Sequence, residues 1–293
     1  MHTIKRLFLF AGYDKNGILN DALVYYLSQL NKFGDIVLVM DSNCDESELA
    51  KVKPYCFYAA AVRHGEYDFG SYKRAFIWAT EKANLSNYDF MYMVNDSVYG
   101  PLFDIGEYLN KMESLGTDAF GMVKKTGGKF EHIQSWFIGM TQTIFLSKWF
   151  NDFIMSVKKV EHKTMVTELY ENGFTRKLNE NKIAWQCLYN IYNRGIYNRV
   201  RHLYKIRMPF IKKLSFTRHF GAYGNQILYV LNHIPKKLRD DILSSAHETF
   251  GTEYINRLLT KNPVKILSRK MKYIISRVLC KTEKNCRHHN GAK

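Results

Sequence analysis

Short and almost entirely apolar runs recur in the N-terminal third of the chain, and they constrain the fold more than any other feature. They are residues 6–12, 35–40, 56–62 and 90–94. Two segments between them, 19–30 and 72–83, have apolar residues at helical spacing. Apolar strands that alternate with helices predict an α/β fold, in which helices cover both faces of a mostly parallel sheet.

A less regular pattern follows residue 101. It predicts a helix over 104–115, strands over 119–123 and 133–140, and helices over 144–157 and 163–178. Beyond Trp185 the sequence is aromatic, basic and helical in character. We therefore expect a first domain over residues 1–190 and a mainly helical C-terminal extension over residues 191–293.

The charge of the chain is distributed unevenly between these two parts. Residues 194–293 hold 22 of the 43 Lys and Arg but only 5 of the 27 Asp and Glu, so the first 193 residues are close to neutral. Such asymmetry points to nucleic acid, an anionic membrane surface or an acidic ligand as the partner of the basic region. Its segment 264–279 predicts an amphipathic basic helix, which either lies on an anionic membrane or packs on the main domain.

Other features limit the classes of protein that remain. No apolar stretch approaches the roughly 20 residues that span a bilayer, and the run at residues 7–10 is too short for the roughly 7–15 apolar residues of a signal-peptide core. The five cysteines are odd in number and contain no C-x-x-C pair, which favours a reduced, cytoplasmic setting. Four residues near the C-terminus are of the types that bind zinc: Cys280, Cys286, His288 and His289. Their spacing fits no standard zinc-site template.

Polar residues follow the second and third apolar runs. Ligands of open α/β sheets bind beyond the carboxyl ends of the strands, so these residues are candidates for a site. Asp41 could accept hydrogen bonds from a ribose or a base, or it could cap the helix predicted near 45–51. Gly70 and Ser71 lie where the next helix is expected to start, and a helix N-terminus suits a diphosphate, with Lys73 adding charge. The alternative is a helix capped by Asp68.

The fourth run ends in the sequence Asn95-Asp96-Ser97. Asp96 could hold Mg²⁺ or Mn²⁺, because these ions prefer oxygen ligands and bridge to phosphates. The alternative is a simple turn, since Asn, Asp and Ser all favour turns.

Two later segments supply further candidates. Alternation along the predicted strand places His132, Gln134 and Trp136 on one face, where they could recognise a sugar, or where they could simply form a half-exposed strand. Glu168 and Glu171 are three residues apart and share a face of the predicted helix. Either carboxylate could deprotonate an acceptor hydroxyl, or both could lie on a solvated helix face.

The order of these motifs resembles that of a glycosyltransferase of the GT-A type with the family 2 layout. The residues within the motifs resemble those of the rhamnan synthesis protein F family. The resemblance covers roughly residues 4–190. The residues that carry it are 67–73, 95–97, 100–102, Asp118, Gly121, 132–137, Tyr170, Glu171 and Leu178.

The resemblance implies roles for the candidate residues. Asp41 would contact the nucleoside, Asp96 would bind the metal ion and Glu171 would be the catalytic base, with Glu168 as its rival. The chain departs from the common Asp-x-Asp form at Asp96 and has Glu in place of the usual Asp at residue 171. The remaining donor-binding positions are Asp68, Gly70, Ser71, Lys73, Asn95 and Ser97. His132, Gln134 and Trp136 are assigned to the acceptor or sugar.

The function implied is transfer of a sugar, rhamnose by the family's name, from a nucleotide diphosphate donor to a bacterial surface polysaccharide or a lipid-linked glycan. We expect inversion at the anomeric carbon, a divalent cation, and a cytoplasmic enzyme at the inner face of the membrane, held there through its basic region. No nucleic acid is expected as a partner. Two other functions compete with this one, a nucleic-acid-binding protein and a catalytically inactive glycan-binding scaffold.

Overall fold

The computed structural model describes residues 3–128 and 130–289, without the side chains of residues 163, 219, 220 and 277–289. The chain divides into two compact units, Met1–Gly195 and Ile196–Lys293. The first unit extends beyond residue 190 because the last strand of its sheet runs to Tyr192. The zinc ligands suggested by the sequence, Cys280, Cys286, His288 and His289, have side chains outside the described residues.

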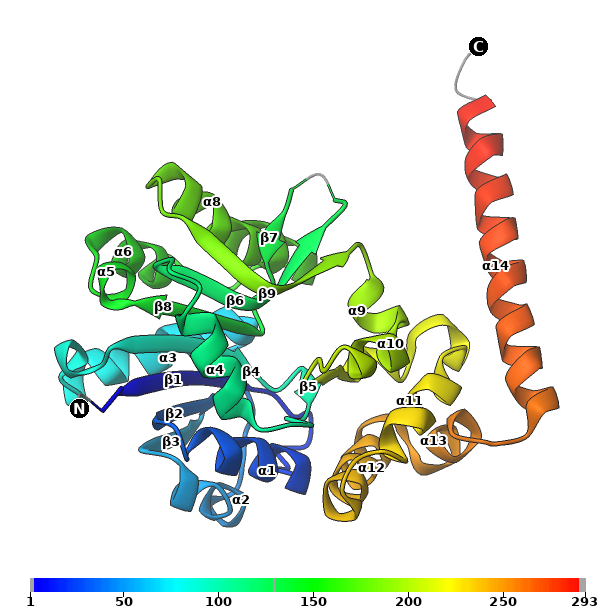
Figure 1. The fold of residues 1–293 in the computed structure, drawn as a ribbon, viewed down its shortest axis with the longest axis horizontal. Helices are drawn as coiled ribbons and strands as arrows, with labels where there is room; N and C mark the ends of the chain where they lie inside the picture. The colour runs from blue at the N-terminus through cyan, green and yellow to red at the C-terminus, as the bar shows by residue number, and fades with distance from the viewer. Residues whose placement is uncertain (1–2, 129, 290–293) are drawn as a thin grey trace. The chain divides into compact units, whose positions relative to one another are not determined.

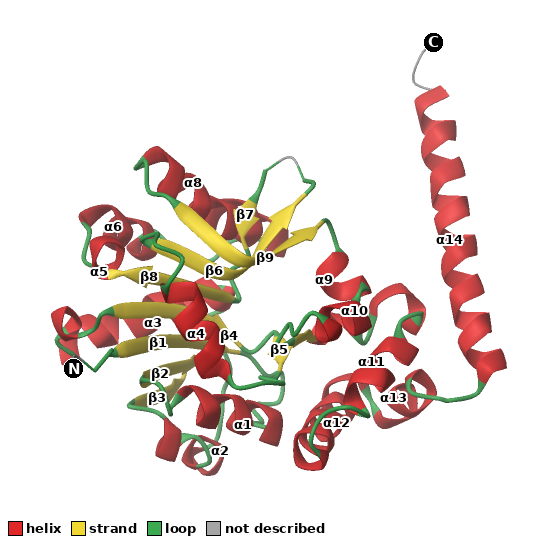
Figure 2. Ribbon diagram, in the orientation of Figure 1, coloured by secondary structure: helices red, strands yellow, loops and turns green. Residues whose placement is uncertain are grey.

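Eight strands of the described chain form one sheet in the first unit, in the order β3-β2-β1-β4-β8-β6-β7, with β9 beside β6 (Figures 1 and 2). The pairs among β3, β2, β1 and β4 are parallel, as is the β6–β9 pair, whereas β8 is antiparallel to both of its neighbours. This mixed, mostly parallel sheet has the predicted α/β class. Its strands are β1 (Arg6–Gly12), β2 (Asp35–Met40), β3 (Tyr58–Ala61), β4 (Phe90–Asn95), β6 (Ala119–Thr126), β7 (His132–Ile133), β8 (Phe137–Thr141) and β9 (Trp185–Tyr192).

Helices cover both faces of the sheet. Leu7 and Leu9 of β1 belong to the buried cluster that packs against α3, α5, α6 and α8. The next residues along the strand point to the opposite face, where Phe8 stacks on Tyr92 and Phe10 contacts Tyr26 of α1. The helices and short strand of this unit are α1 (Asp21–Leu30), α2 (Glu46–Ala50), α3 (Tyr67–Lys82), β5 (Val98–Tyr99), α4 (Ile105–Glu113), α5 (Gln142–Phe145), α6 (Lys148–Met155), α7 (Lys163–Val166) and α8 (Asn172–Glu180). Short helical turns lie at Lys53–Tyr55, Leu85–Asn87 and Thr167–Glu171, the last of them a π-helical turn.

The strand register brings the polar segments together. Gly12 pairs with Met40, Met40 pairs with Ala61, and Ala11 pairs with Asn95. The carboxyl ends of β1, β2, β3 and β4 therefore meet at one edge of the sheet, which we call the carboxyl edge.

Several predicted boundaries were wrong, each for a local reason. The helix predicted over 72–83 begins at Tyr67, because Asp41 closes the turn just before it by accepting the N–H groups of His64 and Gly65. The helix predicted over 144–157 breaks in two because the side chain of Ser147 caps α6. The strand predicted over 133–140 is interrupted between β7 and β8, and β6 continues to Thr126.

The segment after Trp185 was predicted to be helical, but it forms strand β9. Among the described strands it pairs only with β6, and most of its side chains are half-buried or exposed. An edge strand of this kind lacks the continuous apolar run that marked the central strands.

The second unit is helical apart from one short strand. No helix in the described part of the chain is both long enough and apolar enough for a membrane span. The elements of the second unit are α9 (Gly195–Asn198), which begins at the unit boundary, α10 (Val200–Lys205), β10 (Ile211–Lys212), turns at Lys213–Ser215 and Arg218–Gly221, α11 (Gly224–Leu231), α12 (Lys236–Phe250), α13 (Thr252–Leu258) and α14 (Pro263–His289).

Candidate active site

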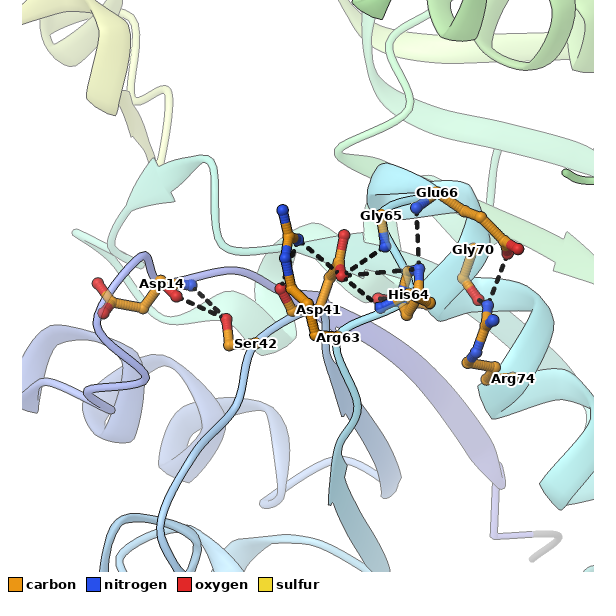
Figure 3. Close-up of polar contacts among 10 residues, drawn as sticks. Asp14, Asp41, Ser42, Arg63, His64, Gly65, Glu66, Gly70 and Arg74 are labelled. Atoms are coloured by element: carbon orange, nitrogen blue, oxygen red, sulfur yellow. Dashed lines mark hydrogen bonds and ion pairs between the residues drawn. The ribbon is translucent and has the colours of Figure 1, made fainter. Parts of the chain in front are cut away.

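Asp41 lies at the end of β2 and holds the loop that leads from β3 into α3 (Figure 3). Its Oδ1 accepts the backbone N–H groups of His64 at 2.8 Å and Gly65 at 2.9 Å, and it pairs with Arg63 at 2.8 Å. Burial alone would raise the pKa of Asp41, but these two N–H groups, His64 and Arg63 hold it below its ordinary value. Asp41 does not cap the following helix, because Asp45 occupies that position. Its proposed contact with a nucleoside stays a prediction.

Two hydrogen bonds join the loop after β1 to the end of β2. The Ser42 hydroxyl accepts the Asp14 N–H at 2.9 Å and donates to the Asp14 carbonyl at 2.7 Å (Figure 3). Next to Asp14 in the chain, the half-exposed Tyr13 ring has its centre 5.2 Å from the Arg63 guanidinium. An aromatic ring next to a cation suits a nucleoside and its phosphates. The sequence reasoning missed Tyr13 and Arg63, although each directly follows an apolar run.

His64 and Ser71 are buried and bind each other rather than solvent. The Glu66 N–H donates to His64 Nδ1 at 3.0 Å, so the proton of the neutral ring lies on Nε2, which donates to Ser71 Oγ at 3.0 Å. Burial lowers the pKa of His64 despite the nearby charge of Asp41. At Gly70, a Cβ atom would lie 2.3 Å from Glu66 Cβ and 2.7 Å from His64 Cε1, so glycine permits this close packing.

The start of α3 differs from the predicted diphosphate site. The Gly70 N–H is already bonded to the Glu66 carbonyl, so the N–H groups of the first turn are those of residues 67–69. Lys73 donates to the Val157 carbonyl at 2.8 Å, and Arg74 pairs with Glu66 at 2.6 Å (Figure 3). The N-terminus of α3 therefore lies about one turn earlier than the sequence predicts, and its use as a diphosphate site stays a prediction.

Asn95 is buried at the end of β4. It precedes Asp96, the candidate metal ligand, and bonds to Asp68 at the start of α3. Its amide donates to Asp68 Oδ2 at 2.9 Å, and its oxygen accepts the Ser97 hydroxyl at 2.6 Å and the Ser97 N–H at 3.1 Å. Burial raises the pKa of Tyr72 well above its ordinary value, and the charges of Asp68 and Asp96 raise it further. Two carboxylates therefore act on the same buried ring.

This arrangement is compatible with a hard divalent cation. Mg²⁺ is commonly held by one or two carboxylates and completes its shell with waters and substrate phosphates. Asp96 and Asp68 supply carboxylates of this type, and Asp68 does not cap α3, because Glu66 occupies the N-cap position. Among the described residues, no group of three or more His, Cys, Asp or Glu forms a fuller metal site.

Glu171 faces the same edge from the π-helical turn. Its Oε1 lies 3.4 Å from the Ser135 nitrogen and 3.7 Å from His132 Nε2. The Tyr72 hydroxyl donates to the Ser135 carbonyl at 3.0 Å. Ser135 thus connects Glu171 to the Tyr72 ring, whose pKa the charges of Asp68 and Asp96 raise.

His132 presents a basic nitrogen to Glu171. Its Nδ1 lies 3.2 Å from the Phe130 carbonyl, which can only accept, so Nδ1 carries the ring proton and Nε2 faces the carboxylate. Burial lowers the pKa of His132, although the charge of Glu171 works in the opposite direction. A neutral imidazole in this position can receive a proton from Glu171.

Glu168 is more exposed than Glu171, although its charge also acts on His132. It pairs with Arg176 and accepts the Asn172 amide at 2.8 Å. The two glutamates lie in a π-helical turn, not in the predicted α-helix, and a turn of this width offsets residues three apart by a larger angle. The geometry favours Glu171 over Glu168 as the base.

Gln134 and Trp136 are also buried. The indole Nε1 donates to Gln134 Oε1 at 2.9 Å, and the Trp136 carbonyl accepts the Asn95 N–H at 3.2 Å. The alternative prediction, that these residues lie on a half-exposed strand, is therefore wrong. Both side chains support the segment beside Asn95, and their assignment to sugar recognition stays a prediction.

A cavity of about 380 Å³ lies away from this cluster, at the amino ends of β1 and β2. Residues in its lining include Lys5, Asp35, Phe57, Lys82 and Tyr88. It shares no residue with the carboxyl-edge cluster and contains no arrangement of a base beside paired carboxylates. We therefore place the candidate site by its chemistry rather than by the size of the hollow.

The class of the protein follows from its family. The enzyme is a glycosyltransferase that uses a nucleotide-sugar donor, built on a mixed α/β sheet. The chain belongs to the rhamnan synthesis protein F family, whose model matches residues 36–292. The match extends into the basic region, beyond the part that the motifs covered. A search among curated proteins gave no match.

Solved structures that match the chain have low sequence identity to it. A cytidylyltransferase from Leptospira borgpetersenii serovar Hardjo-bovis has 13% identity and a TM-score of 0.37, over 66% of this chain and 77% of that one. Residues 1–349 of TarS from S. aureus have 11% identity and a TM-score of 0.38, over 87% and 90%. Core-mannan synthase A from Aspergillus fumigatus, in an Mn/GDP form, has 11% identity and a TM-score of 0.28, over 53% and 63%.

Proposed function

We propose that the enzyme transfers a sugar from a nucleotide diphosphate donor to a hydroxyl of a bacterial surface polysaccharide or lipid-linked glycan, with inversion. The observation that carries this proposal is that Ser135 joins Glu171 to Tyr72, while Asn95, at the end of β4 beside Asp96, donates to Asp68. Rhamnose is the sugar that the family's description suggests.

The donor would lie along the carboxyl edge. Tyr13, Arg63 and Asp41 would contact the nucleoside, and the N–H groups of residues 67–69 would face the diphosphate. Asp96 and Asp68 would hold Mg²⁺ or Mn²⁺. Such an ion, when bound, stabilises the negative charge that develops on a departing diphosphate.

Glu171 would act as the general base. It removes the proton from the acceptor hydroxyl, the acceptor oxygen forms a bond to the anomeric carbon, and the bond from that carbon to the diphosphate breaks. A single displacement of this kind inverts the anomeric configuration. His132 Nε2, at 3.7 Å from the carboxylate, is positioned to take the proton onward.

The acceptor suggests where the enzyme works. Acceptors of bacterial surface glycans are commonly built on lipid diphosphates at the inner face of the membrane. We infer a cytoplasmic enzyme that associates with this face, which agrees with the positive charge of residues 194–293.

The proposal is tested with a panel of nucleotide sugars, in which release of the nucleotide diphosphate is measured with Mn²⁺ present. We expect release from one donor and its loss in the Asp96→Ala variant. A wild-type protein that binds glycans without releasing a diphosphate from any donor would instead be an inactive scaffold. NMR of the product gives its anomeric configuration, and retention would remove Glu171 from the role of direct-displacement base.

A further inference from the structure

Helix α14, drawn in orange and red in Figure 1, carries an exposed apolar stripe. We call the following residues the α14 stripe: Val264, Leu267, Met271, Ile274 and Ile275. Each is between 47% and 73% exposed. At 3.6 residues per turn, they fall within an arc of about 100° on one side of the helix. Soluble proteins rarely leave contiguous apolar surface of this kind uncovered without an interaction to use it.

The opposite side of α14 is packed within its own unit. Arg269 donates to the Arg257 and Leu258 carbonyls, both at 2.8 Å, and the Tyr273 ring lies 6.1 Å from that of Tyr223. Ile266, Arg269, Tyr273 and Ser276 are the half-buried residues of this side. The helix is therefore held by one face, while the α14 stripe points away from the residues that hold it.

Lysines flank the stripe. By helical position, Lys265 and Lys272 border one side of it and Lys270 borders the other, and all three are exposed. Apolar residues bordered by cations match the layered chemistry of an anionic membrane, in which phosphate headgroups lie above the acyl chains. Long lysine side chains can reach those headgroups while their helix lies at the boundary.

We propose that this face of α14 lies on an anionic membrane surface, with the α14 stripe among the upper acyl chains and Lys265, Lys270 and Lys272 at the headgroups. This inference does not rest on the sugar-transfer reaction, because it concerns only the surface of the second unit.

Two other partners fit the helix less well. Nucleic acid would use the lysines, but its phosphate backbone offers nothing to five exposed apolar side chains. A second copy of the chain could cover the stripe, but it would bring the same flanking lysines close to one another, and like charges repel. Both alternatives give distinct outcomes in the experiment below.

The test is co-sedimentation of the full chain with vesicles. Vesicles of phosphatidylglycerol and phosphatidylethanolamine in equal parts supply the anionic surface, and phosphatidylcholine vesicles supply the neutral one. We expect binding to the anionic vesicles that weakens as salt is added. The stripe variant Leu267→Gln/Met271→Gln/Ile274→Gln keeps every charge and the helix propensity, and we expect it to bind about tenfold or more weakly.

A matched variant controls for the loss of apolar surface as such. Leu146→Gln/Met155→Gln/Leu214→Gln replaces three apolar residues of similar exposure outside α14, and we expect it to bind like the wild type. Equal vesicle binding by the stripe variant and the wild type would overturn the proposal, as would no binding by the wild type. RNA binding lost in Lys265→Gln/Lys270→Gln/Lys272→Gln but kept in the stripe variant, without vesicle binding, would assign the face to nucleic acid. A dimer that only the stripe variant abolishes, again without vesicle binding, would assign it to a second copy.

Discussion

In the first unit, buried polar groups lie at the carboxyl edge of the sheet and also at the opposite edge, where β1 and β4 begin, which we call the amino edge. The two groups differ in how their charges are arranged. At the amino edge, Arg6 forms a two-bond pair with Glu113 at 2.6 and 2.7 Å, and Tyr92 and Asn110 complete the network. Burial opposes it, yet Glu113 raises the pKa of Arg6 above its ordinary value. The charges of Arg6 and Glu113 therefore compensate each other within this network.

At the carboxyl edge, charged and polar groups come from several separate elements instead of forming one closed pair. Asp41 pairs with Arg63, Asp68 accepts the Asn95 amide, and Glu171 lies 3.4 Å from the Ser135 nitrogen and 3.7 Å from His132 Nε2. Ionisable groups whose pKa values are shifted by burial and by neighbouring charges tend to cluster at functional sites. The comparison teaches that a functional site is marked by the kinds of groups that converge on it, since burial alone is common to both edges.

The largest expected effect is at Glu171. Glu171→Gln keeps the shape of the side chain but removes the base, so we expect the transfer rate to fall by about 10²–10⁴. The free energy of unfolding should change by less than about 1 kcal/mol, because this side chain is part-exposed. The control is Glu168→Gln three residues earlier, which should leave the rate near that of the wild type.

The amino edge should show the reverse pattern. Glu113→Ala leaves the Arg6 guanidinium buried without its partner, and we expect a loss of about 3–5 kcal/mol in the free energy of unfolding, measured by urea denaturation. Activity per folded molecule should be unchanged. Glu107→Ala removes an exposed pair on the same helix and should change stability by no more than about 0.5 kcal/mol. A large loss of activity in folded Glu113→Ala protein would remove the distinction between the edges.

A smaller effect is expected at His132. If its neutral ring takes the proton from Glu171, the rate should fall as pH drops through the pKa of His132, which burial holds below its ordinary 6.5. Glu171, Glu168 and Lys125 are the charged groups that act on this ring. We expect His132→Gln to lower kcat about tenfold with little change in KM, and to remove this acid limb from the pH profile. An unchanged profile would reduce His132 to a packing residue.

The smallest effect concerns acid stability at the carboxyl edge. The pKa of Asp41 is lower in the folded protein than its ordinary 3.8, so its contribution to stability is present above about pH 4 and is lost as pH falls through the folded pKa. We expect Asp41→Asn to lower the free energy of unfolding by about 1–2 kcal/mol at pH 7. The difference from the wild type should shrink between pH 5 and pH 3 in urea denaturation, while Asp45→Asn should show no such change.

Much of this edge could be predicted from the sequence, because strand ends and their register are governed by continuous apolar runs. Asp41, Asn95 and Asp96 lie at the carboxyl edge for that reason. The position of Lys73 could not be predicted, since its ammonium group bonds to a carbonyl 84 residues away. Tyr13 and Arg63 lack any motif, and only the folded loops bring them together.

The later part of the first unit was harder to predict. Strand β9 lies at the sheet edge beside β6, where half-exposed side chains hide the strand signal. The π-helical turn at Thr167–Glu171 contains both Glu168 and Glu171, and no local spacing rule reveals such a turn. Tertiary packing, rather than propensity, decided both features.

The central claim is that the carboxyl edge binds a nucleotide diphosphate through Asp96. Calorimetric titration of UDP, GDP, CDP and dTDP with Mn²⁺ present tests it most directly, in the wild type and in Asp96→Asn. We predict that one nucleotide binds the wild type and that Asp96→Asn weakens this binding by about tenfold or more, with an unchanged free energy of unfolding. Equal affinity in the two proteins, or no binding of any of the four nucleotides, would contradict the account.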